Sequence, residues 1–443
     1  MSASTTTPAA VPEPVIGDVR QFLATAIGQL EPEPVRSGHR GRPRILPSTC
    51  LWAAMLVCVI DGFTSQLALW RQVAIIGLWE YPRYPVSDAA VYKRLAQEHT
   101  AGLATLLQQI TTLLDARLAP WLPALVPPLA TFATDIVALD ETTLDPLARR
   151  LPATTTGAAH GRTLPGKLAM LFDVRRQRVR TIQIIPEATQ NEKVAARDVL
   201  DGLAPGTLVL CDLGYFAFRF FDDLTDQGLW WVTRLREKTS YTVVQTFAQH
   251  GDTFDGLVWL GAYRADRAAH PVRLVQYRRG ATLHRYLTNV CDPQCLPLQE
   301  VAAVYARRWD IEMAFQLIKQ LLGLSLWWST KDRVIYQQLY AVVIIAQIVQ
   351  ALRLEIAGRA GVDVFDVSLP LVVRYLPVFA ARGEDPVARV VADGRRAGFI
   401  RPSRRIVITT PDPPLAYALS IADQPVRRTP RYAQRRCTRL PTD

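Results

Sequence analysis

Hydrophobic and polar positions along the chain follow two different patterns. Up to residue 128, apolar residues recur at helical spacing, which predicts helices over Asp18–Leu30, Leu51–Trp70 and Ser87–Leu114. From residue 131, short β-rich runs alternate with helical stretches. The predicted order is strand, strand, strand, helix, strand, helix, strand, over Ile136–Leu139, Lys167–Val174, Arg178–Ile185, Asn191–Leu203, Thr207–Cys211, Tyr215–Gln227 and Leu229–Arg234. This order predicts an α/β fold, a mixed sheet with helices on its faces.

Two further segments complete the pattern. Residues 235–297 are β-like and moderately basic, which predicts an inserted β-rich subdomain, and Tyr336–Leu354 is a strongly apolar helix. We therefore expect a disordered tail over residues 1–15 and a helical N-terminal domain over 16–128. The core is expected in two parts, 129–234 and, with helices, 298–380, on either side of the insertion at 235–297. A basic C-terminal region follows over 381–443.

The segment VYARRWDIEMAFQLIK, residues 304–319, predicts a single amphipathic helix. At about 100° of rotation per residue, Arg308, Glu312 and Lys319 lie within roughly 60° of Tyr305, beside a separate apolar stripe. One face therefore carries one negative and two positive charges along about 21 Å. Such a row suits phosphate groups held around a cation, although the usual explanation of the spacing between Arg308 and Glu312 is an ordinary ion pair on a helix surface.

Three carboxylates are candidates for catalysis and metal binding. Asp140 and Asp212 each follow a short hydrophobic strand, where functional side chains collect, and Glu312 comes from the helix. In the sequence CDLGYF, the glycine permits a tight turn after Asp212. If the three acids converge, their repulsion calls for cations, and oxygen ligands favour two Mg²⁺ or Mn²⁺ ions that would clamp a displacement at phosphorus. Either aspartate alone is more often a turn residue, and the rival acids are Asp135, Glu141, Asp145 and Asp173.

The charge of the chain favours a polyanionic partner. The net charge is +11 and the pI is about 9.5, so nucleic acid is the first expectation and an anionic membrane the second. Lys93 and Arg94 lie on a short helix after Ser87, a plausible N-cap, and could belong to a helix-turn-helix. Arg40 and Arg42 in RGRP resemble the core of an AT-hook. Solvated basic tails and a proline-rich linker are the alternative explanation.

Other features point to a cytoplasmic protein. The six scattered cysteines contain no CxxC pair, so reduced thiols are expected and structural zinc is not. No apolar run reaches the length that spans a membrane, so Leu51–Ile60 and Leu339–Val349 are expected to be buried helices. The N-terminus has no secretory signal pattern.

The spacing Tyr-x2-Arg-x3-Glu-x6-Lys, met by Tyr305, Arg308, Glu312 and Lys319, resembles the YREK signature of IS4-type insertion-sequence transposases. These belong to the DDE group, whose catalytic core is RNase H-like. Asp140 in ALDETTL and Asp212 in VLCDLGYF look like the family's first and second catalytic aspartates. The resemblance covers about residues 130–355, including a β-rich insertion before the last catalytic residue.

This resemblance implies a Mg²⁺-dependent enzyme that cuts at transposon ends and joins the freed 3′-hydroxyls to target DNA. It also implies a homodimer on paired DNA ends, an end-binding N-terminal domain and a nucleoid-associated location. Arg234 resembles a family position near the active-site rim. Some family members hold a flipped base against a tryptophan of the insertion, and the candidates here are Trp230, Trp231 and Trp259. Trp309 could instead line the DNA-binding groove.

Two other functions stay open. One is a domesticated DNA-binding protein that has lost catalysis, and the other is an RNase H-like nuclease that cuts without strand transfer.

Overall fold

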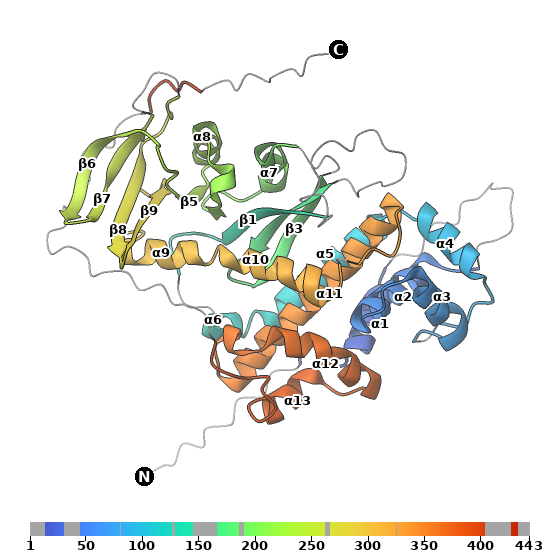
Figure 1. Ribbon diagram of the computed structural model, residues 1–443. Helices are drawn as coiled ribbons and strands as arrows, with labels where there is room; N and C mark the ends of the chain where they lie inside the picture. The colour runs from blue at the N-terminus through green and yellow to red at the C-terminus, as the bar shows by residue number, and fades with distance from the viewer. Residues whose placement is uncertain are drawn as a thin grey trace, which may run out of the picture. The chain divides into compact units, whose positions relative to one another are not determined.

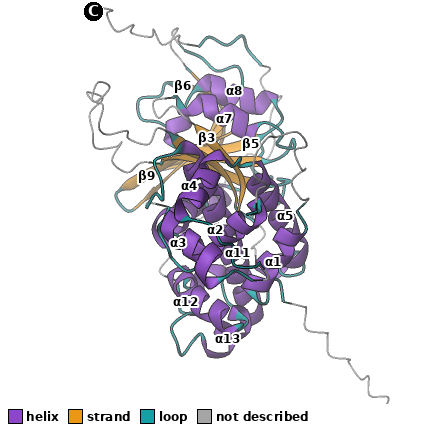
Figure 2. Cartoon of the chain, turned by 90° about the vertical axis from the view of Figure 1, so that its right-hand side faces the viewer, coloured by secondary structure: helices purple, strands orange, loops and turns teal. Residues whose placement is uncertain are grey.

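Figure 1 shows the computed structural model of the chain. The structure describes residues 14–30, 45–79, 81–125, 129–144, 166–185, 190–261, 266–324, 326–403 and 427–432. The chain divides into two compact units, each built from two separate stretches of sequence. The first unit comprises Met1–Leu125 with Leu317–Arg404, and the second comprises Val126–Gln316 with Arg405–Asp443. All nine named strands belong to the second unit, and the named elements of the first are helices (Figure 2).

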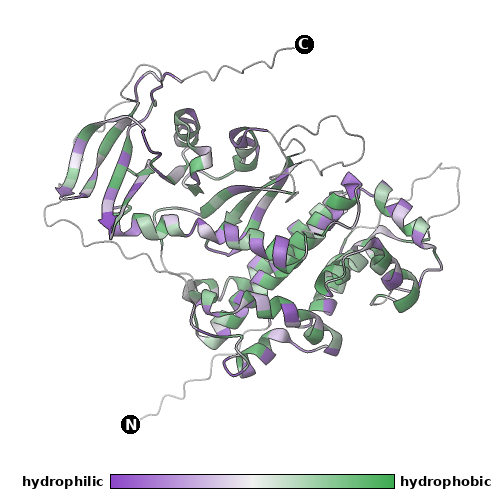
Figure 3. Cartoon of the chain, in the orientation of Figure 1, coloured by the Kyte–Doolittle hydropathy of each residue, from purple (hydrophilic) through white to green (hydrophobic). Residues whose placement is uncertain are grey.

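The first unit is organised around one long buried helix, α11 (Asp332–Ala360), which is hydrophobic along most of its length (Figure 3). Because α11 is apolar on nearly all sides, it is stable only when other helices surround it. Those that pack against it are α2 (Ser48–Ile60), α4 (Asp88–Gln97), α5 (Ala101–Leu118), α6 (Leu122–Leu125), α12 (Leu369–Arg382) and α13 (Pro386–Asp393). The helix α1 (Val19–Gly28) packs on α2 and α5.

By length and composition, α11 is the one helix among the described residues that could cross a membrane. Its most apolar window has a mean hydropathy of 1.7, but 94% of that window is buried inside the structure, as in the core helix of a soluble protein. The expectation that no apolar run reaches spanning length is therefore wrong, since the helix has 29 residues. The expectation of a buried helix is confirmed.

Two of the predicted helices of the first unit are broken. The predicted helix Leu51–Trp70 ends as α2 at Ile60, and Gly62, with φ of +71°, turns the chain before α3 (Gln66–Arg71) begins. The predicted helix Ser87–Leu114 is interrupted where Glu98 becomes extended, with ψ of 143° between α4 and α5. Ser87 is the N-cap of α4, as predicted, and its hydroxyl accepts the backbone N–H of Ala90 at 3.3 Å.

The second unit contains one nine-stranded mixed sheet with the order β3-β2-β1-β4-β5-β9-β8-β7-β6. Strands β1, β2 and β3 are antiparallel, β4 and β5 are parallel to β1, and β9 is antiparallel to β5. The strands of the first part are β1 (Ile136–Thr143), β2 (Lys167–Asp173), β3 (Arg178–Ile185), β4 (Leu208–Cys211) and β5 (Trp230–Arg234). Those of the inserted part are β6 (Tyr241–His250), β7 (Thr253–Leu260), β8 (Val272–Arg279) and β9 (Thr282–Thr288). The predicted α/β fold with a mixed sheet is confirmed, and the inserted strands β6 to β9 extend the same sheet.

Helices cover both faces of this sheet. Figure 1 shows α7 (Glu192–Leu200) and α8 (Phe218–Asp226) on one side and α9 (Leu298–Ala306) and α10 (Trp309–Gln316) on the other. The core between the sheet and α7 and α8 is rich in aromatic rings. Phe221 of α8 stacks on Trp231 of β5 with ring centroids 4.4 Å apart. The opposite side carries the helix that bears Glu312.

Candidate active site

Two of the predicted acids lie next to each other because of strand register. In the parallel pair β1 and β4, Leu139 is opposite Cys211, so Asp140 and Asp212 follow at the same level. All four residues of β4 are buried, as are Ile136–Leu139 of β1, so Asp140 is the first polar residue of β1 and Asp212 is the first polar residue after β4. The sequence predicts that a strand ends before Asp140. Instead β1 continues to Thr143, because Asp140 and the residues after it pair with β2 on the other side.

The predicted single helix over residues 304–319 is broken. Helix α9 ends at Ala306 and α10 begins at Trp309, and the amides of Arg307 and Arg308 bond to carbonyls only three residues back. Beyond Gln316 the chain forms a π-helical turn, Leu317–Leu321, which belongs to the first unit. The four motif residues therefore do not lie on one continuous α-helix, and Lys319 lies in a different unit from Glu312.

A buried side-chain network fixes the start of α10. Oδ2 of Asp310 accepts from Nε2 of Gln177 and from Nε of Arg307, each at 2.7 Å. Arg307 also donates to the carbonyl of Val174 at 3.1 Å. Gln177 lies in the turn between β2 and β3 with φ of +51°, a conformation uncommon outside glycine. This network attaches the beginning of α10 to the sheet, and α10 packs on β1 and β2.

Arg308 brings the three predicted acids together. Its Nη2 lies 2.7 Å from Oε1 of Glu312, its Nη1 lies 3.8 Å from Oδ2 of Asp140, and its Nε lies 3.9 Å from Oδ1 of Asp212. A different nitrogen of one guanidinium group thus faces each carboxylate. The side chain of Arg308 is 8% exposed, whereas those of Asp140, Asp212 and Glu312 are 24%, 45% and 34% exposed. The acids therefore face solvent above a buried arginine.

The neighbouring charges change the titration of Asp140. Burial raises the pKa of its carboxyl to about 6, although the backbone N–H of Glu141 and the charge of Arg308 act in the opposite direction. The charges of Asp212 and Glu312 raise this pKa further, which is the expected effect of like charges at short range. Tyr305 is also buried, and its ring lies 5.3 Å from that of Tyr286, so burial raises the pKa of its hydroxyl.

The oxygen-only donor set of Asp140, Asp212 and Glu312 fits a hard divalent cation. In their present positions, no group of three acidic, histidine or cysteine side chains among the described residues could hold one metal ion.

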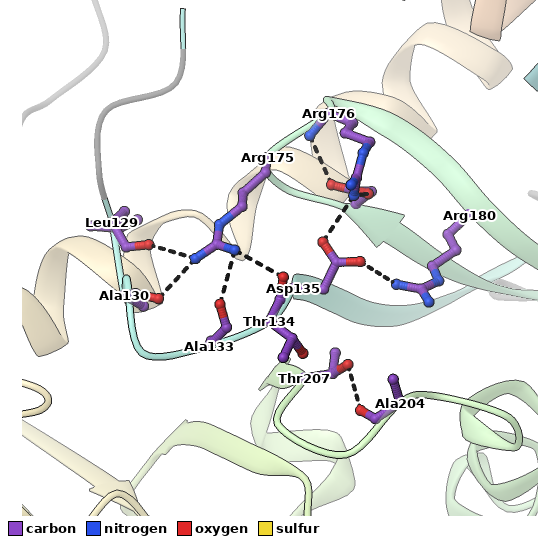
Figure 4. Close-up of polar contacts among 11 residues, drawn as sticks. Leu129, Ala130, Ala133, Thr134, Asp135, Arg175, Arg176, Arg180, Ala204 and Thr207 are labelled. Carbon is purple, nitrogen blue, oxygen red and sulfur yellow. Dashed lines mark hydrogen bonds and ion pairs between the residues drawn. The ribbon is translucent and has the colours of Figure 1, made fainter. Parts of the chain in front are cut away.

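The rival acids that the structure describes have other partners. Asp135 binds Arg176 at 2.9 Å and Arg180 at 2.8 Å (Figure 4). Asp173 also binds Arg176, at 2.8 Å. Nearby, Arg175 donates to four backbone carbonyls of the segment that precedes β1, those of Leu129, Ala130, Ala133 and Thr134 (Figure 4). Glu141 lies 3.5 Å from Lys167. Asp145 lies outside the described residues.

The predicted DNA-binding residues are spread over both units. Arg234 is exposed at the end of β5, and Lys93 is exposed on α4. Arg94 is engaged internally, because it binds Glu98 at 2.8 Å and Ser48 at 2.7 Å. Arg40 and Arg42 lie outside the described residues. Sequence reasoning missed the Gln177–Asp310 pair, which no local pattern marks.

The tryptophans of the sheet are mostly engaged in packing. Trp231 is fully buried, and Trp230 packs edge-on against Phe132. The ring of Trp259 lies under Arg428, whose guanidinium carbon is 4.3 Å from the ring centroid. Trp309, in contrast, is 59% exposed.

Comparisons with known proteins indicate one family. A family model described as the transposase DDE domain matches residues 131–348. The transposase for insertion sequence element IS231F from Bacillus thuringiensis subsp. israelensis is 23% identical over 233 residues, covering 40% of this chain and 48% of that protein. Transposase InsG for IS4 from Escherichia coli K12 is 25% identical over 171 residues, covering 36% and 38%. The chain thus spans about half or less of these relatives' length.

A solved piggyBac transposase synaptic complex with hairpin DNA aligns over 89% of this chain and 84% of that one. Its TM-score of 0.38 and identity of 10% are too low to bear on the fold. The family model spans the segment that carries Asp140, Asp212 and Glu312. The resemblance to IS4-type transposases is therefore confirmed: residues 131–348 match the transposase DDE domain, and the chain is similar to a transposase of the IS4 insertion sequence.

Proposed function

We propose that the protein is a DNA transposase with an RNase H-like catalytic core, which cuts at insertion-sequence ends and joins 3′-hydroxyls to target DNA. The observation that carries the proposal is the meeting of Asp140, Asp212 and Glu312 around one guanidinium group. The sheet supports it. Three antiparallel strands followed by two parallel ones, with an acid on β1 and another directly after β4, is the arrangement expected of such a core.

The three acids would hold two Mg²⁺ or Mn²⁺ ions, which, when bound, would activate a water or 3′-hydroxyl and stabilise the departing oxygen. The fold of the protein positions the three carboxylates. Asp140 and Asp212 are fixed by the strand ladder, and Glu312 is fixed through α10. Their partial exposure lets a DNA phosphate approach from solvent, while the apolar strands beneath them exclude water from the other side.

DNA contacts are assigned to basic residues around this site and in the helical unit. Arg234 would bind a phosphate near the reacting strand. In the helical unit, Lys319 would bind DNA, as would Lys93 on α4 together with Arg40 and Arg42 of the N-terminal region. Tyr305 would support a sugar or base contact. The net charge of +11 favours this partner. A homodimer on paired DNA ends is part of the proposal.

The two alternative functions predict different products. A nuclease without strand transfer would cut the same ends and leave free 3′-hydroxyls, whereas a domesticated protein would bind the ends without cutting. Since all three acids are present and lie together, catalysis is the better supported function.

The decisive test is Glu312→Gln, assayed with a labelled duplex that carries the element's terminal sequence. Cleavage in Mg²⁺ should fall by about 10³-fold or more, while duplex binding stays within about twofold. The control is Glu237→Gln, an exposed glutamate of the same unit that should leave cleavage unchanged. Cleavage by Glu312→Gln at the wild-type rate would reject the proposal. Joining of precut ends to a second DNA separates a transposase from a simple nuclease.

A further inference from the structure

A short segment near the C-terminus, residues 427–432 with the sequence RRTPRY, lies on the second unit (Figure 1). Arg431 and Arg267 form an antiparallel bridge in which the amide of each donates to the carbonyl of the other, at 3.0 and 2.6 Å. The amide of Arg428 also donates to the carbonyl of Ala269, at 2.9 Å. The segment therefore pairs with the loop between β7 and β8 as an added strand pairs with the edge of a sheet.

The side chains of this segment alternate between two environments. Every second one is partly buried, and the others are exposed: Arg428, Pro430 and Tyr432 belong to the first group, and Arg427, Thr429 and Arg431 to the second. A period of two is that of an extended chain with one face against a surface. The segment thus has an inner face, which contacts the unit, and an outer face.

Arg428 occupies a site that is built for a guanidinium group. Its central carbon lies 4.3 Å from the centroid of the Trp259 ring. Its Nε donates to the carbonyl of Ala268 at 2.9 Å, and its Nη2 donates to the carbonyl of Leu260 at 2.5 Å. An aromatic ring and two carbonyl acceptors suit a planar group with several donors, and the compact ammonium group of lysine would fit them less well.

Tyr432 contacts a different part of the unit. Its hydroxyl donates to Oδ2 of the buried Asp222 on α8 at 2.9 Å, and its ring packs against the hydrophobic core beside the sheet. The same carboxylate accepts the amides of Ala269 and His270 at 2.7 and 3.1 Å. Asp222 therefore joins three pieces of the chain: α8, the loop between β7 and β8, and the C-terminal segment.

The charges of the two surfaces are complementary. The segment contains three arginines and no acid, whereas α8 contains one arginine and three acids, Asp222, Asp223 and Asp226. Asp226 binds Nη2 of Arg427 at 2.9 Å and lies 2.8 Å from Nε2 of His270. This surface therefore favours an extended basic peptide over an acidic one.

We propose that α8 and the loop between β7 and β8 form a peptide-binding groove, whose ligand is the chain's own segment 427–432. The groove recognises the segment through Arg428 and Tyr432. Because α8 packs on β5 while the loop joins two inserted strands, the bound segment is a strap that fastens the insertion to the first part of the sheet. This site is separate from the DNA contacts proposed above.

Hydrogen exchange of the full-length protein without DNA tests the strap, with the amide of Arg267 as the reporter. In Arg428→Met this amide should exchange about tenfold faster or more, because the segment that accepts its hydrogen bond detaches. Tyr432→Phe, which keeps the ring and loses one hydrogen bond, should give a smaller rise of about fivefold. The matched control is Arg431→Met, an arginine of the outer face, which should stay within about twofold of wild type.

A peptide of residues 427–432 tests the groove itself. The labelled peptide should bind full-length Arg428→Met, whose groove is open, at least about tenfold more tightly than it binds wild type, whose groove is occupied. Adding Trp259→Ala to Arg428→Met should remove this binding. If Arg428→Met does not fold, Arg428→Lys provides the same two measurements, since it keeps the charge and loses the planar group.

Three results would overturn the proposal. The first is equal exchange of the Arg267 amide in Arg428→Met and Arg431→Met. The second is equal binding of the peptide to wild type and to Arg428→Met. The third is faster exchange of this amide when the wild-type protein is diluted, because the bound segment would then come from a second copy of the chain.

Discussion

The strand-borne acids and the helix-borne acid are positioned by different forces. Asp140 and Asp212 follow buried runs that are joined by a backbone ladder from Ile136 opposite Leu208 to Leu139 opposite Cys211. Glu312 belongs to an eight-residue helix whose start depends on Asp310 and its two side-chain partners. Backbone ladders tolerate single side-chain changes, whereas a junction held by one carboxylate does not. We therefore expect the helix side of the site to be the more sensitive to substitution.

The strongest test of this contrast is Asp310→Ala. Asp310 is buried and accepts from both Gln177 and Arg307, so its removal takes the carboxylate acceptor from two donors, one of them charged, and leaves both with the carbonyl of Val174. We expect the free energy of unfolding to fall by about 3–5 kcal/mol, as for other broken buried ion pairs. The cleavage rate should also fall well below that of wild type, because Glu312 is only two residues away. Urea denaturation and single-turnover cleavage measure the two effects.

Asp222→Ala is the control for stability alone. Asp222 is equally buried but lies on α8, where it accepts the backbone N–H of Ala269 at 2.7 Å and the hydroxyl of Tyr432 at 2.9 Å. Its loss should destabilise the unit while leaving cleavage per folded molecule close to wild type. Equal losses of cleavage in both variants would show that Asp310 has no special role in placing Glu312.

The same contrast explains what the sequence could predict. Asp140 and Asp212 were predictable because hydrophobic runs of strand length end before them, and Glu312 was predictable from its motif. The helix break was not, because the residues of the junction fit a helical pattern and nothing local marks a stop. The break is associated with a contact between Gln177 and Asp310, which are 133 residues apart in sequence. The division of the motif between two units is likewise a tertiary property.

On the strand side, the ionisation of Asp140 should lower the free energy of unfolding, and this effect should depend on pH. Burial raises the pKa of Asp140 to about 6 from an ordinary value near 3.8, so the folded state holds this proton more tightly than the unfolded state between these values. The Asp140 contribution to stability is therefore fully present below pH 4 and is lost as the pH rises to about 6. Asp140→Asn removes this loss. In EDTA its gain in unfolding free energy over wild type should grow from near zero at pH 4 to at most about 3 kcal/mol at pH 8.

Asp201→Asn, at a position exposed after α7, provides the comparison for this pH series. Its difference from wild type should be flat from pH 4 to 8. If the difference in unfolding free energy between Asp140→Asn and wild type is also independent of pH, then the ionisation of Asp140 does not destabilise the folded protein.

The smallest effect concerns Gly214, the glycine of the turn after Asp212. The sequence suggests that this glycine permits a tight turn, but its φ lies outside the left-handed region, so the backbone there does not require glycine. A Cβ at this position would lie 2.5 Å from Oε2 of Glu192, the mobile end of a flexible side chain. Gly214→Ala should therefore change the unfolding free energy by less than about 1 kcal/mol, because Glu192 can move aside. In a Glu192→Ala background the same substitution should become stabilising by roughly 0.5 kcal/mol, since only the reduced entropy of the unfolded chain remains.

Urea denaturation of the four variants of this cycle measures the coupling. A loss of several kcal/mol in both backgrounds would show instead that the backbone itself needs glycine, and that the strand side depends on a turn as strictly as the helix side depends on Asp310.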